Sequence, residues 1–250
     1  MSTMSLRDYW VKTVREKIME KKSRIVLALD KIPFVEGFDE EKLYSKCVDL
    51  LKAVEPFIVG VKVGLPLVVN YGFSLIEKIV QKYRKRLIFI YDGKVADVAH
   101  VNEVVAKRVY EVGFDLIIVH GMVGYEGGVE GVVNVARSIG KGILVLAAMS
   151  HRGAIRLNSL TMDILTEFCD VEGVVGYVLP ATYPSLIKIA REFLGKDYLI
   201  LSPGVGAQGA FFGTAVMFGA DLEIIGRSIY ESSVPREEVI KLSKIYSRLC

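Results

Sequence analysis

The sequence predicts an α/β protein of the (β/α)8 TIM-barrel type, with an additional N-terminal helix. Eight short runs rich in Val, Ile and Leu recur along the 250 residues, and most are continuously apolar rather than alternating. Such runs are typical of strands buried on both faces of a parallel sheet. Longer amphipathic stretches separate them, and single barrels commonly have this length. We therefore expect residues 1–250 to form one barrel domain, with an open doubly wound sheet as the alternative fold.

The expected strands and helices alternate along the chain. An amphipathic stretch at residues 6–21 predicts the helix before the first strand. The apolar runs predict strands at residues 25–29, 58–63, 87–91, 116–119, 143–147, 174–179, 198–201 and 222–225. Apolar residues at helical spacing predict helices at residues 40–54, 67–81, 98–112, 128–139, 160–169, 185–193 and 236–248. The segment between the seventh and eighth strands is too short to define a clear helix.

Composition limits the function classes that need to be considered. Apolar residues make up 52% of the chain, but no run approaches the ~20 apolar residues that span a bilayer. The charged N-terminus lacks the apolar core of a signal peptide, so we expect a cytoplasmic protein without membrane contact. The net charge of +3 is scattered, which argues against nucleic acid but allows an anionic small molecule. Cys47, Cys169 and Cys250 fit neither a disulfide framework nor a metal site, and the first two should pack as small apolar groups.

Polar residues gather at one end of the predicted strands. Those that end or follow an apolar run on its C-terminal side are Asp30, Lys62, Asp92, His120, Ser150 and Arg227. Active sites of (β/α)8 barrels lie at this end of the strands. His120 and the nearby His151 receive no catalytic assignment, because a histidine at a strand end or in a loop is ordinary.

Residues 88–100, IFIYDGKVADVAH, contain the densest group of charges. Asp92 and Lys94 are two residues apart, so a strand would point both side chains the same way, and Asp97 follows three residues later. Lys62 lies within the apolar run IVGVKVG, where a lysine needs carboxylate partners such as Asp30 and Asp92. Charges near a core are costly unless paired. The cluster predicts either a catalytic site or a purely stabilising ion-pair network.

Two glycine-containing segments follow the last two predicted strands. They are LSPGVGAQG at residues 201–209 and IIGRSIY at residues 224–230. Glycine lets backbone N–H groups approach an anion, and barrel phosphate sites are often built from the loops after strands seven and eight. Gln208 and Arg227 could add hydrogen bonds and a forked charge. The alternative is a tight turn beside a surface arginine.

Taken together, these segments resemble the orotidine 5′-phosphate decarboxylase family, particularly its archaeal forms. The motifs LALD, VKVG, DGKVAD, AAMSHRGA, SPGVGAQG and IIGRSIY occur in family order between residues 25 and 230. The resemblance implies conversion of orotidine 5′-phosphate to uridine 5′-phosphate and CO₂ in pyrimidine biosynthesis, without metal or cofactor. It also implies a homodimer with shared active sites. Two alternatives stay open: a Mg²⁺-dependent sugar-phosphate lyase of the same superfamily, and a non-catalytic nucleotide-binding barrel.

The resemblance also implies a role for each matching residue. Lys94 would protonate C6 of the pyrimidine, Asp92 would lie beside the substrate carboxylate, and Asp97 would reach into the neighbouring subunit's site. Lys62 would join these catalytic residues by completing the charge chain with Asp30. The residues implied in substrate binding are Asp30 and Lys62 at the ribose, Ser150 with Gln208 at the pyrimidine edge, Pro203 lining the pyrimidine side, Gly204 in the glycine-rich loop, and Gln208, Gly226 and Arg227 at the phosphate. Electrostatic stabilisation by a fixed ammonium suits a carbanion that has no adjacent electron sink.

The chain departs from the family pattern at two positions. Val101 replaces a threonine that commonly contacts ribose across the dimer, and Arg152 replaces a proline after the Ser-His pair. The first change removes a hydrogen-bond donor, and the second alters a segment that we expect to close over the substrate. Residues 150–158 and 204–213 are the longest stretches without predicted structure, and both are expected to act as closing loops.

Overall fold

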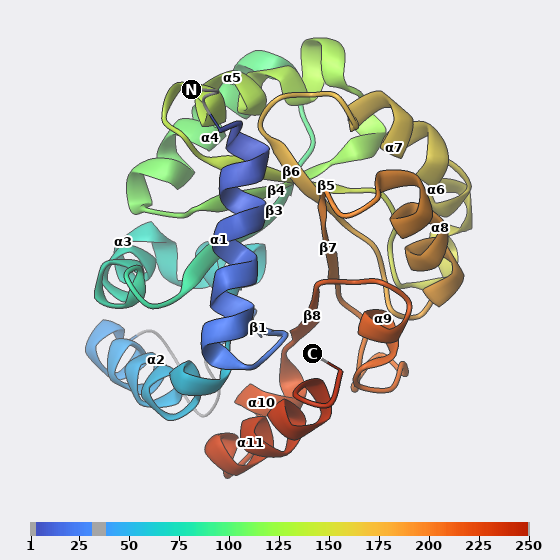
Figure 1. The fold of residues 1–250 in the computed structure, drawn as a ribbon. Coiled ribbons are helices and arrows are strands. Elements are labelled where there is room, and N and C mark those ends of the chain that lie inside the picture. The colour runs from blue at the N-terminus through green and yellow to red at the C-terminus, as the bar shows by residue number, and fades with distance from the viewer. Residues whose placement is uncertain (1–3, 32–38, 250) are drawn as a thin grey trace.

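Eight parallel strands form a closed barrel in the order β1 to β8 (Figure 1). The computed structural model describes residues 4–31 and 39–249. Strand β1 pairs with both β2 and β8, which closes the sheet and excludes the open doubly wound alternative. The strands are β1 (Ile25–Leu29), β2 (Gly60–Gly64), β3 (Ile88–Val95), β4 (Leu116–His120), β5 (Gly142–Leu146), β6 (Val174–Val178), β7 (Leu199–Ser202) and β8 (Leu222–Ile225). The predicted fold class is confirmed.

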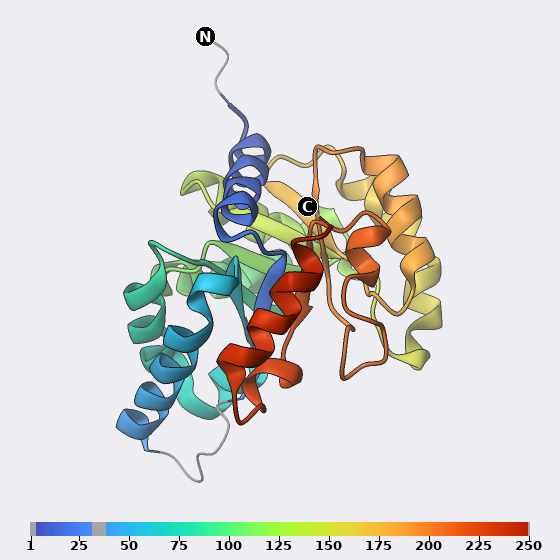
Figure 2. The same cartoon turned by 60° about the horizontal axis from the view of Figure 1, so that its bottom comes forward.

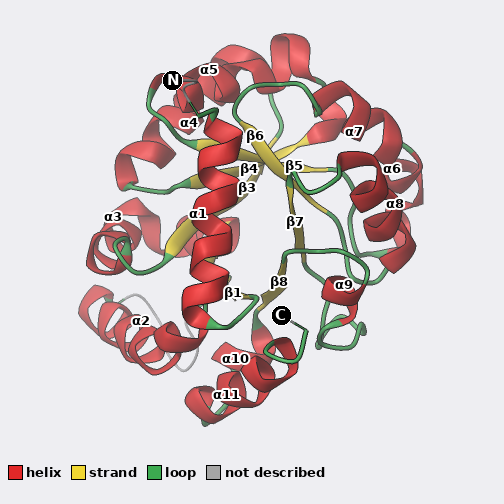
Figure 3. Cartoon of the chain, viewed as in Figure 1, coloured by secondary structure: helices red, strands yellow, loops and turns green. Residues whose placement is uncertain are grey.

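Helices surround the barrel on its outer side, except α1, which lies across one end (Figure 3). The helices are α1 (Leu6–Lys21), α2 (Glu40–Val54), α3 (Leu65–Tyr83), α4 (Ala99–Val112), α5 (Glu130–Ser138), α6 (Ile155–Ser159), α7 (Thr161–Phe168), α8 (Pro184–Leu194), α9 (Thr214–Met217), α10 (Arg227–Tyr230) and α11 (Pro235–Tyr246). The last helix, α11, packs beside α2 and completes the ring next to β1 (Figure 2).

The strands bury both faces because they separate two apolar layers. Outward-facing side chains such as Val61 and Phe89 pack against the ring of helices, whereas inward-facing ones such as Val26 and Ile90 fill the barrel. Burial on both sides explains why these strands have continuous apolar sequences instead of the alternation of a half-exposed sheet.

Helix α1 closes the N-terminal end of the barrel, and Figure 1 shows it lying across that opening. Trp10, Val14 and Ile18 are buried in the same cluster as the barrel interior. The Trp10 indole N–H donates to the Gly140 carbonyl, and Arg15 pairs with Asp221 at the start of β8. The opposite, C-terminal end remains available for a site.

Two expectations about local structure are wrong. Residues 150–158 are not an irregular loop, because Arg152–Ala154 form a 3-10 turn that leads directly into α6. Strand β3 does not end near Tyr91 but continues to Val95, so Asp92 and Lys94 belong to the strand itself. In addition, Arg227 begins a short helix, α10, that the sequence did not predict.

Candidate active site

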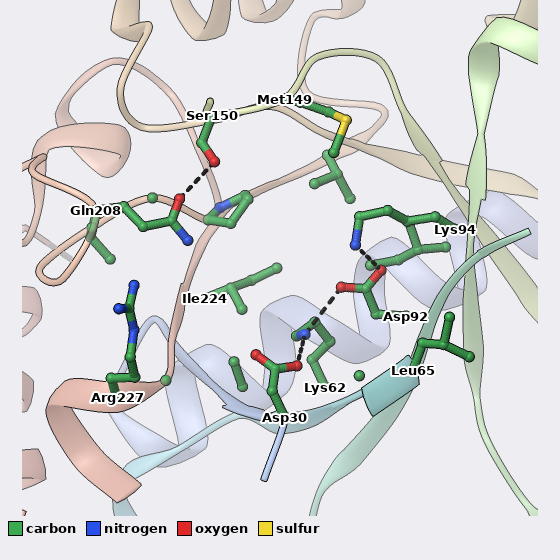
Figure 4. Close-up of a pocket in the computed structure, with 18 of the residues that line it drawn as sticks. Asp30, Lys62, Leu65, Asp92, Lys94, Met149, Ser150, Gln208, Ile224 and Arg227 are labelled. Carbon is green, nitrogen blue, oxygen red and sulfur yellow. Dashed lines mark hydrogen bonds and ion pairs between the residues drawn. The ribbon is translucent and has the colours of Figure 1, made fainter. Parts of the chain in front are cut away.

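A cavity of about 480 Å³ opens at the C-terminal ends of the strands. All the predicted site residues except Asp97 line it. Figure 4 shows Asp30, Lys62, Asp92 and Lys94 on one wall, with Ser150, Gln208 and Arg227 across the cavity from them. Segments that lie more than a hundred residues apart in the sequence therefore meet around one cavity.

Strand alternation places three of the charges inside the barrel. Asp30 and Asp92 lie two residues beyond Ala28 and Ile90, which face the barrel interior. Lys62 is in register with both Ala28 and Ile90, so all three charged side chains continue the interior face. Gly64 leaves room for them, because a Cβ there would overlap the Asp30 carboxylate. The inward lysine inferred from the sequence is thus buried, with Lys62 only 6% exposed.

These side chains form a chain of alternating charge. Lys62 Nζ lies 2.8 Å from Asp30 Oδ1 and 3.0 Å from Asp92 Oδ2. Asp92 Oδ1 in turn lies 2.9 Å from Lys94 Nζ. Asp92 therefore accepts from two ammonium groups and Lys62 donates to two carboxylates. The pairing compensates for the loss of hydration that burial imposes on Lys62 and Asp92.

The pKa shifts in this chain favour the charged forms. Burial by itself would lower the pKa of Lys62, but the carboxylates of Asp92 and Asp30 raise it above its usual value of 10.5. Burial by itself would raise the pKa of Asp92, but the ammonium groups of Lys62 and Lys94 hold it below its usual value of 3.8. Both residues are consequently ionised at neutral pH.

Lys94 has an unusual backbone conformation. Its φ of +45° lies in the left-handed region, and the pairing register between β3 and β4 shifts between Tyr91 and Val95. Non-glycine residues seldom adopt this conformation, and it costs on the order of 1–3 kcal/mol. The irregularity occurs at the residue that carries the ammonium group facing the cavity.

The opposite wall is built from the loops after β5, β7 and β8. Ser150 Oγ lies 2.6 Å from Gln208 Oε1, and this hydrogen bond joins the first two loops across the cavity mouth (Figure 4). Pro203 and Gly204 also line the cavity, and Gly204 has a φ of +102° that favours glycine. Arg227 supplies the cationic group on this wall.

Asp97 lies outside this cavity. Its exposed carboxylate accepts a hydrogen bond from the Val98 backbone N–H at 2.7 Å. The fully buried Asn102 holds its backbone: Oδ1 accepts from the Asp97 N–H, and Nδ2 donates to the Asp97 and Gly128 carbonyls. Val98 and Val104, 50% and 68% exposed, lie on the same segment. A single chain therefore presents Asp97 beside an apolar surface.

The remaining reactive side chains stay apart from the cavity. His120 is half-buried and its Nδ1 accepts from the Met122 N–H, while burial and the nearby Lys94 charge lower its pKa. Cys47 is fully buried, and burial raises its pKa to about 12, whereas Cys169 is only partly buried. Within residues 4–31 and 39–249, no group of three or more His, Cys, Asp or Glu side chains is placed to hold a metal ion.

None of the helices in the described ranges is long and apolar enough to cross a membrane.

Much of the apolar lining of the cavity was not predicted from the sequence. Leu65, Pro66, Met149 and Ile224 form part of the cavity wall. Each lies within four residues of a predicted site residue, so its position near a strand end was the available signal. Apolar residues are too common for their type alone to indicate a site.

Comparison with known proteins is consistent with this geometry. A family model described as "Orotidine 5′-phosphate decarboxylase / HUMPS family" matches residues 23–242. Orotidine 5′-phosphate decarboxylase of Pyrococcus abyssi is 38% identical over 214 residues, covering 85% of this chain and 94% of that protein. The enzyme of Methanosarcina barkeri is 33% identical over 225 residues, covering 90% and 95%.

Solved structures of orotidine 5′-monophosphate decarboxylases match most of this chain. Orotidine 5′-monophosphate decarboxylase from Methanocaldococcus jannaschii, complexed with the inhibitor BMP, is 30% identical with a TM-score of 0.77, covering 89% of this chain and 98% of that one. The Sulfolobus solfataricus enzyme gives a TM-score of 0.76 at 28% identity, covering 91% and 99%. The family model and these relatives, together with the barrel and its cavity, show that the chain belongs to the orotidine 5′-phosphate decarboxylase / HUMPS family.

Proposed function

We propose that this chain converts orotidine 5′-phosphate to uridine 5′-phosphate and CO₂, as a cytoplasmic enzyme of pyrimidine biosynthesis. The observation that carries the proposal is the charge chain from Asp30 to Lys94, which faces Gln208 and Arg227 across one cavity. This arrangement offers an ammonium group for the reacting carbon at one side and phosphate-binding groups at the other.

Lys94 and Asp92 perform the chemistry in this proposal. When the bond between C6 and the carboxylate breaks, CO₂ departs and the electron pair remains on C6. The Lys94 ammonium stabilises that charge and then transfers a proton from Nζ to C6, which leaves a neutral amine. Asp92, itself paired with Lys62, holds Lys94 in place through an ion pair, so little reorganisation is needed as the charge develops. The proposal needs neither metal nor cofactor.

The other cavity residues bind the substrate. Gln208, the Gly226 backbone and Arg227 take the 5′-phosphate, with Gly204 and Pro203 shaping the loop beside the pyrimidine. Ser150 and Gln208 read the pyrimidine edge, and Asp30 with Lys62 contacts the ribose. Phosphate binding far from C6 contributes to catalysis by orienting the base against Lys94.

The proposed enzyme is a homodimer in which Asp97 serves the partner's site. Support comes from the exposure of Asp97 outside its own cavity and from the exposed Val98 and Val104 around it. An apolar surface beside an isolated carboxylate suits contact with a second copy. Val101 lies on the same surface, where a valine can pack against the partner but cannot donate a hydrogen bond to ribose.

The direct test follows the absorbance loss of orotidine 5′-phosphate with the purified protein, with and without excess chelator. We expect turnover in both conditions. Absence of turnover would overturn the proposed function, and loss of turnover with chelator would favour a metal-dependent lyase. Binding of uridine 5′-phosphate without turnover would identify a non-catalytic nucleotide-binding barrel.

A further inference from the structure

Glu223 is a buried carboxylate that the proposed chemistry does not use. It lies in β8 between Leu222 and Ile224, which face the barrel interior, so its own side chain points outward into the helix layer. The residue is 0% exposed. A carboxylate in such surroundings is costly unless hydrogen bonds replace its hydration.

The carboxylate is saturated by donors from two elements. Glu223 Oε2 accepts from the Gly213 N–H at 2.9 Å and from the Tyr246 hydroxyl of α11. Oε1 accepts from the Ala215 N–H at 2.8 Å and, more weakly, from the Val216 N–H at 3.4 Å. None of these partners is a cation. Burial raises the pKa of Glu223, while the hydroxyl and the three amides oppose that rise.

These contacts connect the two loops of the phosphate site. Strand β8 ends at Ile225, two residues after Glu223, and Gly226 and Arg227 follow. Gly213 ends the loop after β7 that carries Gln208. The loop is also closed on itself around Gln208, because the Gly206 N–H donates to the Ala210 carbonyl at 2.8 Å. Displacement of Gly213 relative to β8 would therefore shift the loop with respect to Arg227.

We propose that Glu223 is a positioning residue that fixes the spacing between the Gln208 loop and Arg227, and thereby sets the affinity for the 5′-phosphate. The inference rests on the proposed function, since it assigns the phosphate to these loops. It predicts that damage to Glu223 weakens phosphorylated ligands selectively. A residue that only stabilised the fold would weaken nucleotide and nucleoside alike.

Glu223→Gln is the sharpest variant, because it preserves size and one acceptor oxygen. Its amide group would face the Gly213 N–H and the Tyr246 hydroxyl. The hydroxyl can rotate to accept, but the Gly213 N–H cannot, so the substitution breaks the contact that holds the end of the loop. Tyr246→Phe removes only the hydroxyl donor and leaves all three backbone contacts.

Asp221→Asn is the matched control. Asp221 lies immediately before β8, at the end opposite the cavity. Its carboxylate receives the Arg191 guanidinium at 2.6 Å and the Ile200 N–H at 2.9 Å. The variant damages a buried carboxylate beside the same strand, far from the loops. It should lower the melting temperature while leaving the preference for phosphorylated ligands intact.

The experiment measures the Kd of uridine 5′-phosphate and of uridine by calorimetry, together with melting temperature and the kcat and KM for orotidine 5′-phosphate. Glu223→Gln should raise the Kd of uridine 5′-phosphate by about tenfold, because one buried donor loses its partner. The Kd of uridine should stay nearly unchanged. KM should rise more than kcat falls. Tyr246→Phe should produce a smaller loss of the same selectivity.

Equal losses for nucleotide and uridine, or a lower melting temperature alone, would overturn the positioning role. If Glu223→Gln does not fold, Tyr246→Phe decides the matter by the same ratio of Kd values. Failure of the wild-type protein to bind uridine 5′-phosphate would instead overturn the proposed function, and the inference with it. A nucleotide preference in the wild type that both variants retain would overturn the inference alone.

Discussion

Single residues in this protein place charge where the fold would otherwise have apolar groups. Lys62 was predictable from sequence, because a lysine within an apolar run must find carboxylates, and Asp30 and Asp92 are its partners. The left-handed backbone of Lys94 was not predictable, because a two-residue spacing describes regular strands only. Glu223 left a similar signal, a lone carboxylate between apolar residues, but its partners lie on elements that the sequence does not pair with it.

At Lys94, replacement by alanine should remove nearly all decarboxylation while product binding stays measurable. The substitution deletes both the charge that stabilises the carbanion and the proposed proton donor, whereas the phosphate-binding wall is untouched. Turnover and uridine 5′-phosphate affinity are measured on the same preparation. A residual rate above about a tenth of the wild-type rate would contradict the assigned role, because it corresponds to a barrier increase of less than ~1.4 kcal/mol.

The lowered pKa of Asp92 predicts how its contribution to stability varies with pH. A carboxylate whose pKa is lower in the folded than in the unfolded state stabilises the protein at pH values above its usual pKa of 3.8. This contribution is lost as the pH falls through the lowered pKa of the folded state. The difference in unfolding free energy between wild type and Asp92→Asn should therefore be constant above about pH 5 and shrink on further acidification. Urea unfolding at several pH values checks this, and a difference that grows towards low pH is the contrary outcome.

At the scale of elements, the apolar runs located all eight strands because burial on both faces leaves an unambiguous pattern. Short elements at the rim were harder to predict. Helix α6 has too few residues to display a period, and Gly153 just before it resembles a turn signal. Helix α10 begins at Arg227 within a segment that also looks like a phosphate loop. Chain geometry around the site therefore depends on tertiary contacts that local sequence does not encode.

Asn102 illustrates one such contact at the start of α4. Replacement by alanine should destabilise the fold by about 1–3 kcal/mol, because the partly buried Asp97 N–H and the buried Gly128 carbonyl lose their partner. It should also lower kcat/KM by freeing Asp97. Thermal unfolding and steady-state kinetics check both effects, with Asn134→Ala on the exposed face of α5 as the control. Equal behaviour of the two variants would refute a specific role for Asn102.

At the scale of the whole molecule, the barrel separates stability from chemistry. Helix α1 seals one end with Trp10, Val14 and Ile18, and the charged cavity occupies the other. The proposed dimer adds a further division, because Lys94 and Asp97 of one chain would serve different sites. That arrangement makes catalysis a property of two chains rather than one.

Subunit mixing tests this shared site. Lys94→Ala and Asp97→Ala are each expected to be inactive, but a hybrid dimer holds one doubly damaged site and one intact site. After random exchange, about half the dimers are hybrids, so activity should return to about a quarter of wild type. Exchange is verified with differently tagged chains. Demonstrated hybrids without recovered activity would mean that Asp97 acts within its own chain.

The left-handed backbone at Lys94 also has a consequence for how this sequence balances durability against turnover. A glycine would relax the strain, so the position favours a residue that cannot catalyse. Lys94→Gly should accordingly melt at a higher temperature than Lys94→Ala, although both variants lose the same charge and the same activity. A higher melting temperature for Lys94→Gly would show that lysine at this position lowers the stability of the backbone at the residue that the reaction requires.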